Sequence, residues 1–358
     1  MAELLIGGMP AVTLRASDAP AEGPAILEAV VLPGRGMMLL QAKVRLPSGE
    51  LFELIHAPPL AEAPGQLDGG PDDFAGNKAF TFGGAILVPY ANRITGRNLE
   101  GSRETEAEVD GRTVRLLRNW GGKAPGAAQY SMHGLILDAQ IPFEQPSEDV
   151  VRGRLQAGSF GGRWPSETEL EFEWRLAGGV LSLRIDAHNR GDEVLPMGIG
   201  WHPYLNLPSQ DRRQARLRLP AAKRAEVNDY DEVLPTGRLL DTVGSPYDFN
   251  APQGAALADL YLDDCFTELE RTGGEAVVEV LDPAAGVGFR ATSPSPEVHA
   301  IQVYAPTDKA FVVVEPQFNL ADPYSPLYPQ GTQTGMTRVA PGGSVTYEAR
   351  LEAFALGT

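Results

Sequence analysis

The chain has 358 residues, a formal net charge of −17 and a single cysteine, Cys265. The acidic balance argues against a nucleic-acid surface, which needs clustered Lys and Arg, and it disfavours anionic lipid as a partner. One cysteine excludes both a disulfide framework and a cysteine-based zinc site within the chain.

The chain also lacks the sequence signals of secretion and of membrane insertion. Its N-terminus carries no basic cluster before an apolar run, and no stretch is apolar for long enough to span a bilayer. We therefore expect a soluble, cytoplasmic protein without a membrane partner, and both a monomer and a homodimer remain open.

Short apolar runs separated by Gly and Pro predict many strands and few helices. In chain order the candidate strands lie within residues 41–46, 113–117, 169–188, 215–219, 276–281, 301–304, 311–315 and 345–353. Residues 169–188 give the clearest pattern, because apolar and polar residues alternate on both sides of Gly178-Gly179. That alternation predicts an antiparallel hairpin with one solvent-facing side. The whole pattern predicts an all-β fold, a large antiparallel β-sandwich.

Two Pro-rich, irregular segments, residues 57–73 and 320–335, interrupt the strand pattern. Neither of them separates two complete sets of strands. We therefore expect both to be long surface loops, and we assign residues 1–358 to a single domain.

Few places in such a chain can carry catalysis. No Gly-x-Ser-x-Gly elbow occurs, and Gly83-Gly84 do not open a helix, which argues against a nucleotide site. The remaining candidates are His, Asp, Glu and Arg among aromatic and turn residues. They lie in segments 88–94, 132–134, 200–208 and 313–317 and, with a weaker pattern, in 262–266.

Each of these segments taken alone also has a purely structural interpretation, since structural networks use the same residue types. Arg93 fits a surface ion pair, and His133 fits a turn before Gly134. His202 fits a buried histidine at a strand end, and Glu315 fits the point where a buried strand meets water.

Taken together, the segments resemble the signature segments of the aldose 1-epimerase (galactose mutarotase-like) family, in the family's order. The matching stretches are Ala91-Asn-Arg-Ile94, His133-Gly134, His202-Pro-Tyr-Leu-Asn-Leu207 and Glu315-Pro-Gln317. The resemblance runs from about Gly83 to the C-terminal strand, and the segments at His202 and Glu315 are its most specific parts.

The resemblance implies a large antiparallel β-sandwich that uses no metal and no organic cofactor on a small-molecule sugar. Glu315 matches the general base that takes the proton from the sugar's O1 hydroxyl, and His202 matches the general acid that protonates the ring oxygen. Arg93, His133 and Asp263 match the residues that hold the sugar. The family pattern of Asp, two variable residues and an aromatic selects Asp263 over Asp264.

The implied reaction suits the residues that are present. Interconversion of α and β anomers needs one proton removed at O1 and one delivered at O5, so that the ring can open and reclose. A carboxylate and an imidazole can do this near neutral pH once burial tunes their pKa values. No nucleophile or metal is required.

The wall of the expected pocket departs from the family pattern. His133 is followed by Gly134-Leu135 rather than by Gly-Gly, and Trp201 rather than Asn or Thr precedes His202. We expect Asn92 to bind the substrate. Trp201, Tyr204 and Tyr304 are candidates for packing on the sugar, and a core role fits each of them equally well; we favour Trp201 for the pocket. No Lys/Arg cluster accompanies the motifs, so we rank a neutral aldohexose above a phosphorylated one.

Three other functions stay open at this point. A sugar-binding protein on the same sandwich would keep the pocket and lose the acid or the base. A metalloenzyme could use His133, His202, Asp263 and Glu315, although none of them shows a short ligand spacing. A glycosidase or polysaccharide lyase could share the sandwich, but a glycosidase needs two carboxylates that flank one bond.

Overall fold

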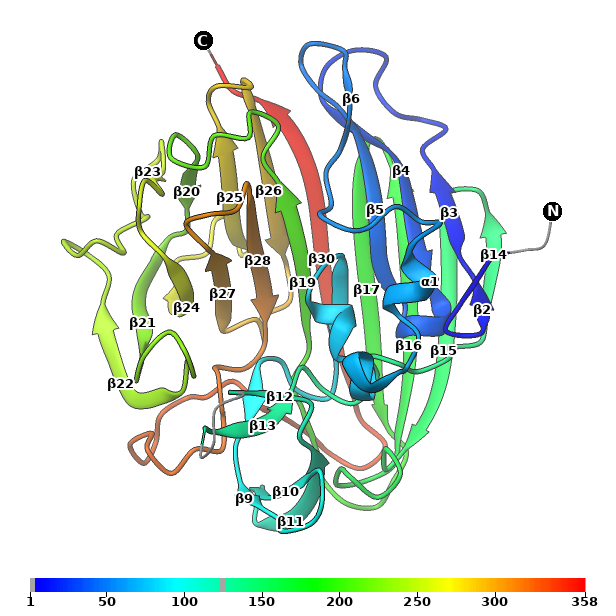
Figure 1. Cartoon of the computed structure of the whole chain (residues 1–358), viewed down its shortest axis with the longest axis vertical. Helices are drawn as coiled ribbons and strands as arrows, with labels where there is room; N and C mark the ends of the chain where they lie inside the picture. Colours follow the sequence, from blue (N-terminus) through cyan, green and yellow to red (C-terminus); the bar gives the residue numbers. More distant parts are fainter. Residues whose placement is uncertain (1–3, 123–126, 358) are drawn as a thin grey trace.

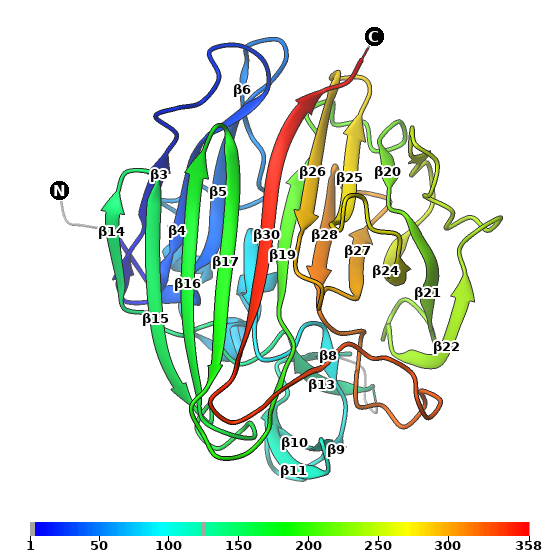
Figure 2. The ribbon, with the colours of Figure 1, turned by 180° about the vertical axis from the view of Figure 1, so that it is seen from behind.

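Two antiparallel β-sheets stacked against each other make up most of the computed structural model, which describes residues 4–122 and 127–357. Figure 1 shows the larger sheet in front, and Figure 2 shows the other sheet from behind. The predicted all-β sandwich is confirmed. No helix in the described part of the chain is long and apolar enough to cross a membrane.

The sheet seen in Figure 2 has nine strands within the described ranges. Their order is β14 (Phe143–Ser147), β15 (Val150–Gly158), β16 (Thr168–Ala177), β17 (Val180–Asn189), β30 (Ser344–Ala355), β26 (Val287–Ser293), β25 (Ala276–Asp282), β20 (Arg216–Arg218) and β23 (Ala255–Ala256).

The facing sheet has eleven strands, again counted over the described residues. Their order is β22 (Pro235–Asp241), β21 (Ala221–Val227), β24 (Leu262–Leu269), β27 (Ala300–Ala305), β28 (Phe311–Gln317), β19 (Gly200–Asn206), β7 (Gly84–Leu87), β5 (Met38–Arg45), β4 (Ala25–Leu32) and β3 (Val12–Arg15), with β6 (Leu51–Glu53) paired to β5.

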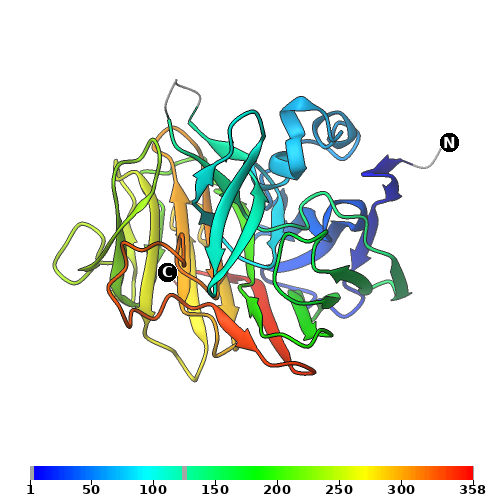
Figure 3. The same cartoon turned by 90° about the horizontal axis from the view of Figure 1, so that it is seen from below.

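Smaller sheets and short helical pieces complete the fold. Among them, β10 (Glu104–Val109) and β11 (Arg112–Leu117) lie at one end of the sandwich, lowest in Figure 1 and nearest the viewer in Figure 3. The small sheets are β11 (Arg112–Leu117), β10 (Glu104–Val109) and β9 (Arg97–Asn98); β12 (Trp120–Gly121), β13 (Gln129–Met132) and β8 (Arg93–Ile94); β1 (Leu5–Ile6) and β2 (Met9–Pro10); and β18 (Leu195–Met197) with β29 (Thr337–Val339). The helical pieces are α1 (Ala63–Gln66) and two 3-10 segments, Pro33–Arg35 and Pro71–Phe80.

The predicted hairpin at residues 169–188 is confirmed as β16 and β17, with Gly178 and Gly179 at φ +59° and +79° in the turn. Those left-handed values favour glycine, which has no Cβ to clash. The register pairs Phe172 with Ile185, so the apolar members of both strands share the core face. Every other predicted strand also coincides with a strand of one of the sheets.

The core between the two sheets is a continuous layer of buried apolar side chains that both sheets contribute. The prediction that segments 57–73 and 320–335 are long surface loops is confirmed only in part. Segment 57–73 contains α1, and segment 320–335 has no strand but begins with the buried residues Leu320 to Asp322. The assignment to a single domain stays a prediction.

Candidate functional site

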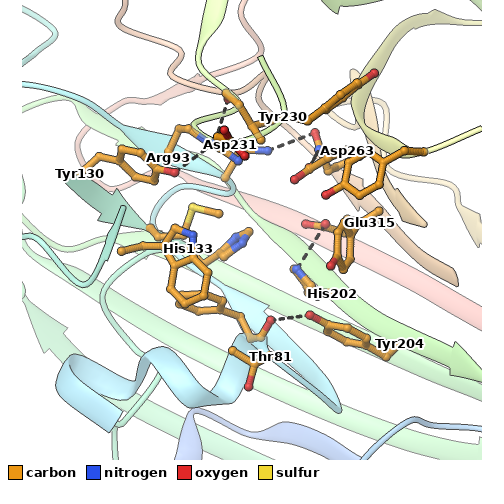
Figure 4. Close-up of a pocket in the computed structure, with 18 of the residues that line it drawn as sticks. Thr81, Arg93, Tyr130, His133, His202, Tyr204, Tyr230, Asp231, Asp263 and Glu315 are labelled. Atoms are coloured by element: carbon orange, nitrogen blue, oxygen red, sulfur yellow. Dashed lines mark hydrogen bonds and ion pairs between the residues drawn. The ribbon is translucent and has the colours of Figure 1, made fainter. Parts of the chain in front are cut away.

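A cavity of about 360 Å³ opens on the side of the eleven-stranded sheet that faces away from the core. Its volume is within the range of small-molecule sites. The sheet contributes side chains from β19, β24, β27 and β28, and the small sheet around β8 and β13 forms the opposite wall. Six of the seven predicted site residues line the cavity: Asn92, Arg93, His133, His202, Asp263 and Glu315. Figure 4 shows most of them around the opening.

His202 and Glu315 face each other across neighbouring strands at the bottom of the cavity. The register that pairs Gly200 with Gln317 and Tyr204 with Val313 sets positions 202 and 315 opposite one another. His202 Nε2 lies 3.3 Å from Glu315 Oε1, and the two side chains are 6% and 2% exposed. A potential proton donor and a potential proton acceptor are therefore in direct contact.

Burial acts on the two groups in opposite directions. It lowers the pKa of His202 to about 4, because the imidazolium loses its hydration. It raises the pKa of Glu315 well above its ordinary value, and the nearby Asp263 carboxylate adds to this while Arg93 opposes it. Burial therefore favours the neutral form of each group, which is the carboxylic acid for Glu315 and the imidazole for His202.

A titration of the imidazole tests this account of the pair. We expect the titration of the His202 ring, followed by NMR and assigned with His202→Asn, to have its midpoint at about pH 4. Desolvation lowers the pKa, so protonation begins only well below the ordinary value for histidine. A midpoint at the ordinary value of 6.5 would contradict the account.

The backbone turn after β13 places His133 over the cavity. His133 has φ +61°, its N–H donates to Asn92 O at 2.7 Å, and its ring centre lies 4.9 Å from that of His202. Burial lowers the pKa of His133 well below its ordinary value, and the neighbouring His202 and Arg93 lower it further. The ring is therefore a neutral hydrogen-bonding group at the cavity wall.

Gly134 makes this turn possible. Its φ is +82°, and a Cβ at this position would lie 2.2 Å from Val88 O. We expect Gly134→Ala to lower the free energy of unfolding by about 2–4 kcal/mol, because backbone strain and overpacking add. Gly111→Ala is the control, since Gly111 has φ +77° and an added Cβ there would meet nothing within 4 Å. Equal losses in the two variants, measured by denaturant unfolding, would contradict the close-approach argument.

Arg93 and Asn92 are held in place by a buried segment that follows β28. Asn319 donates to Ala91 O and accepts from Ala91 N, and Asp322 N donates to Arg93 O. The side chains then bond to each other, with Arg93 Nε donating to Asn92 Oδ1 at 2.7 Å. The position of both residues thus depends on a part of the chain more than 200 residues away.

Asp263 joins the same network from β24. Gln302 Nε2 donates to Asp263 Oδ1 at 2.6 Å, and Asn92 Nδ2 donates to Gln302 Oε1 at 3.1 Å. Burial raises the pKa of Asp263 to about 6, although Arg93 lowers it. Asp264, in contrast, does not line the cavity and pairs with Arg224 at 2.6 Å.

A loop at residues 228–234 lines part of the cavity with side chains that no sequence pattern marked. Tyr230 and Asp231 line the cavity, and Arg93 Nη1 donates to Glu232 O and Val233 O at 2.7 Å each. Val233 has φ +55°, an unfavourable value for a β-branched residue, so these contacts hold a strained turn.

Gln302 is also absent from the predicted site. The strand prediction for 301–304 contains it, but no pattern marks it as a cavity residue. Tyr204 and Tyr304, which we expect from the sequence to pack on a sugar, both line the cavity.

The prediction that Trp201 lines the pocket is wrong. Its side chain is fully buried in the core between the sheets and packs edge to face on Trp174, with ring centres 5.5 Å apart. The reason is the alternation of strand side chains. Because His202 points into the cavity, its neighbour in β19 must point into the core.

A sequence profile of the aldose 1-epimerase family matches residues 62–352. The YphB protein of Escherichia coli K12, described as uncharacterized, is 28% identical over 183 residues, which are 50% of this chain and 57% of that protein. The matched region therefore spans little more than half the length of that relative.

Solved structures share the fold at low sequence identity. A GalM/aldose epimerase homologue from C. elegans is 17% identical, with a TM-score of 0.72 over 97% of this chain and 99% of that chain. A galactose mutarotase-like protein from Clostridium acetobutylicum is 16% identical, with a TM-score of 0.71 over 93% and 95% of the two chains. The profile covers most of the sequence and the sandwich agrees with these structures, so the chain belongs to the aldose 1-epimerase family.

Proposed function

We propose that the protein is an aldose 1-epimerase that interconverts the α and β anomers of a free aldohexose, with Glu315 and His202 as its acid–base pair. The observation that carries the proposal is the 3.3 Å contact between His202 Nε2 and Glu315 Oε1 inside a cavity of sugar size. Membership of the family supports the same reaction.

The pair can reach both reacting oxygens because O1 and O5 are bonded to the same carbon, C1. In the pair's ionic form, Glu315 takes the O1 proton while His202 protonates O5 and the C1–O5 bond breaks. The open-chain aldehyde rotates about C1–C2. Ring closure on the other face of C1 then returns both protons, so the protein ends in the state in which it began.

Ring opening leaves Glu315 protonated and His202 neutral, which is the protonation state that burial favours. The environment therefore stabilises the pair at the open-chain stage. The cyclic sugar reacts with the ionic form, which is reached when the proton moves from Glu315 to His202 across their contact.

The remaining cavity residues hold the sugar in this proposal. Asp263 accepts from hydroxyl groups, and Arg93 donates with Nη2, because Nη1 is already bonded to the loop at 228–234. Asn92 and His133 complete the polar wall. Tyr204 and Tyr304 present ring surfaces to the apolar C–H side of the sugar.

A neutral sugar fits the charges of the cavity better than a phosphorylated one. Asp231, Asp263 and Glu315 line it, whereas Arg93 is the single Lys or Arg among the lining residues that the structure describes. A phosphate group would meet more carboxyl groups than cations.

Polarimetry tests the proposal. Fresh α-D-glucose and, separately, α-D-galactose are dissolved with and without protein, and the change of optical rotation is followed with and without EDTA. We expect acceleration over the spontaneous rate, with no loss on chelation. A protein that binds sugars but accelerates none of several aldoses would be a sugar-binding protein, and the proposal would be wrong.

A further inference from the structure

Three buried side chains in the cavity have the arrangement of a metal-binding cluster. His133, His202 and Glu315 each offer one ligand atom, and these atoms all lie within 4.8 Å of one another. Two ligands of a tetrahedral zinc ion are about 3.4 Å apart, given bonds of about 2.1 Å. The observed 3.3 Å between His202 Nε2 and Glu315 Oε1 agrees with that spacing.

Each of the three side chains also carries a buried polar atom without a partner. Within the described residues, His133 Nδ1, His202 Nδ1 and Glu315 Oε2 have no hydrogen-bond partner. A buried polar atom without a partner is costly, and a ligand that satisfies it recovers part of that cost. Two imidazoles and one carboxylate suit zinc and similar divalent transition metals, and three protein ligands leave the fourth tetrahedral position for water or another ligand.

The charged side chains around His133, His202 and Glu315 do not, taken together, repel a cation. Arg93 lies close enough to lower the pKa of Glu315, but Asp263 acts on the same carboxyl group in the opposite direction. Asp231 adds another carboxylate at the cavity wall. Asp263 and Asp231 therefore outnumber the single arginine at the cavity wall.

We propose that His133, His202 and Glu315 form a binding site for a divalent transition metal such as Zn²⁺, and that the bound ion inhibits the protein. The ion would occupy the lone pairs with which Glu315 and His202 exchange protons. It would also fill the space that the anomeric centre needs. The binding part stands on geometry alone, whereas the inhibition part rests on the proposed function.

The binding test uses the full chain, freed of metal and titrated with Zn²⁺ near neutral pH in competition with a chromogenic chelator. We expect one site per chain, with binding weakened at least tenfold in His133→Asn and in Glu315→Gln, since each variant removes a ligand. Asn tolerates the positive φ at position 133, and Gln has the shape of Glu, so both variants are expected to fold. Co²⁺ in place of Zn²⁺ should give visible absorption bands that both variants lose.

The nine-stranded sheet offers a matched control on β16 and β17. Glu169, Glu171 and His188 form a second possible cluster, but Glu169 is already paired with Arg154 and Arg190. His188→Asn should therefore leave the Zn²⁺ affinity unchanged. Equal affinity in wild type, His133→Asn and Glu315→Gln, or loss of binding in His188→Asn, would overturn the proposed site.

The inhibition test keeps the two proposals distinguishable. Zn²⁺ should raise the apparent KM for the sugar without changing kcat, EDTA should reverse this, and added galactose should weaken Zn²⁺ binding. Zn²⁺ binding in a protein without mutarotase activity would refute the proposed function and support the metal site. Mutarotation that Zn²⁺ does not affect would refute the inhibition.

Discussion

Glu315→Gln should lower the kcat of mutarotation by about 10²–10⁴, which is the contribution of one positioned acid–base group. The amide keeps the shape of the carboxyl group but cannot accept the O1 proton. Glu315 is 2% exposed, and Gln introduces no buried charge, so the fold should survive. The measurement is the initial polarimetric rate after the spontaneous rate is subtracted.

Glu279→Gln is the matched control for this variant. Glu279 is also buried, but it pairs with Arg218 and Arg290 and does not line the cavity. Its replacement should reduce stability and leave kcat unchanged. Equal activity in the Glu315→Gln and Glu279→Gln variants would remove Glu315 from the mechanism.

His202→Asn should lose activity to a similar extent, because the ring oxygen then leaves without a proton. Removal of the O1 proton by Glu315 and delivery of a proton to O5 by His202 belong to the same step. The double variant should therefore be little slower than the slower of the two single variants. Losses that multiply in the double variant would indicate that the two side chains act independently.

Trp201→Ala should lower the free energy of unfolding by about 3–5 kcal/mol, as expected when a large buried aromatic is removed and the cavity cannot collapse fully. The side chain is fully buried and packs on Trp174. Denaturant unfolding followed by circular dichroism gives the loss.

Trp201→Phe separates a core role from a pocket role. It retains an aromatic ring and removes an indole N–H that has no hydrogen-bond partner in the described part of the chain. The KM for the sugar should therefore stay at the wild-type value. An increased KM with unchanged stability would contradict the core role and indicate that Trp201 contacts the sugar.

Local patterns in the sequence were sufficient for the class of fold. Period-two alternation predicted the hairpin at 169–188, and the motif segments predicted six residues that the structure brings to one cavity. The same alternation rule, applied from His202, excludes Trp201 from the pocket. The alternation of the strand, and not the aromatic character of the residue, decides which way Trp201 points.

Other parts of the site depend on contacts between distant segments and leave no local pattern. Gln302 is a polar residue in an apolar strand, and its role becomes visible only when β24 and the segment just before β8 bring Asp263 and Asn92 to it. The carbonyl groups that bind Arg93 belong to a loop about 140 residues away. The sequence likewise does not show that His133, His202 and Glu315 converge within metal-binding distance.

The central claim is that Glu315 and His202 together open and close the ring of a free sugar. Its most direct test is polarimetry of fresh α-D-galactose and α-D-glucose with equal amounts of folded wild-type protein and of the Glu315→Gln variant. The account predicts a strong acceleration by the wild type, insensitive to EDTA, that falls to nearly the spontaneous rate in the variant. Equal acceleration by both proteins would contradict it.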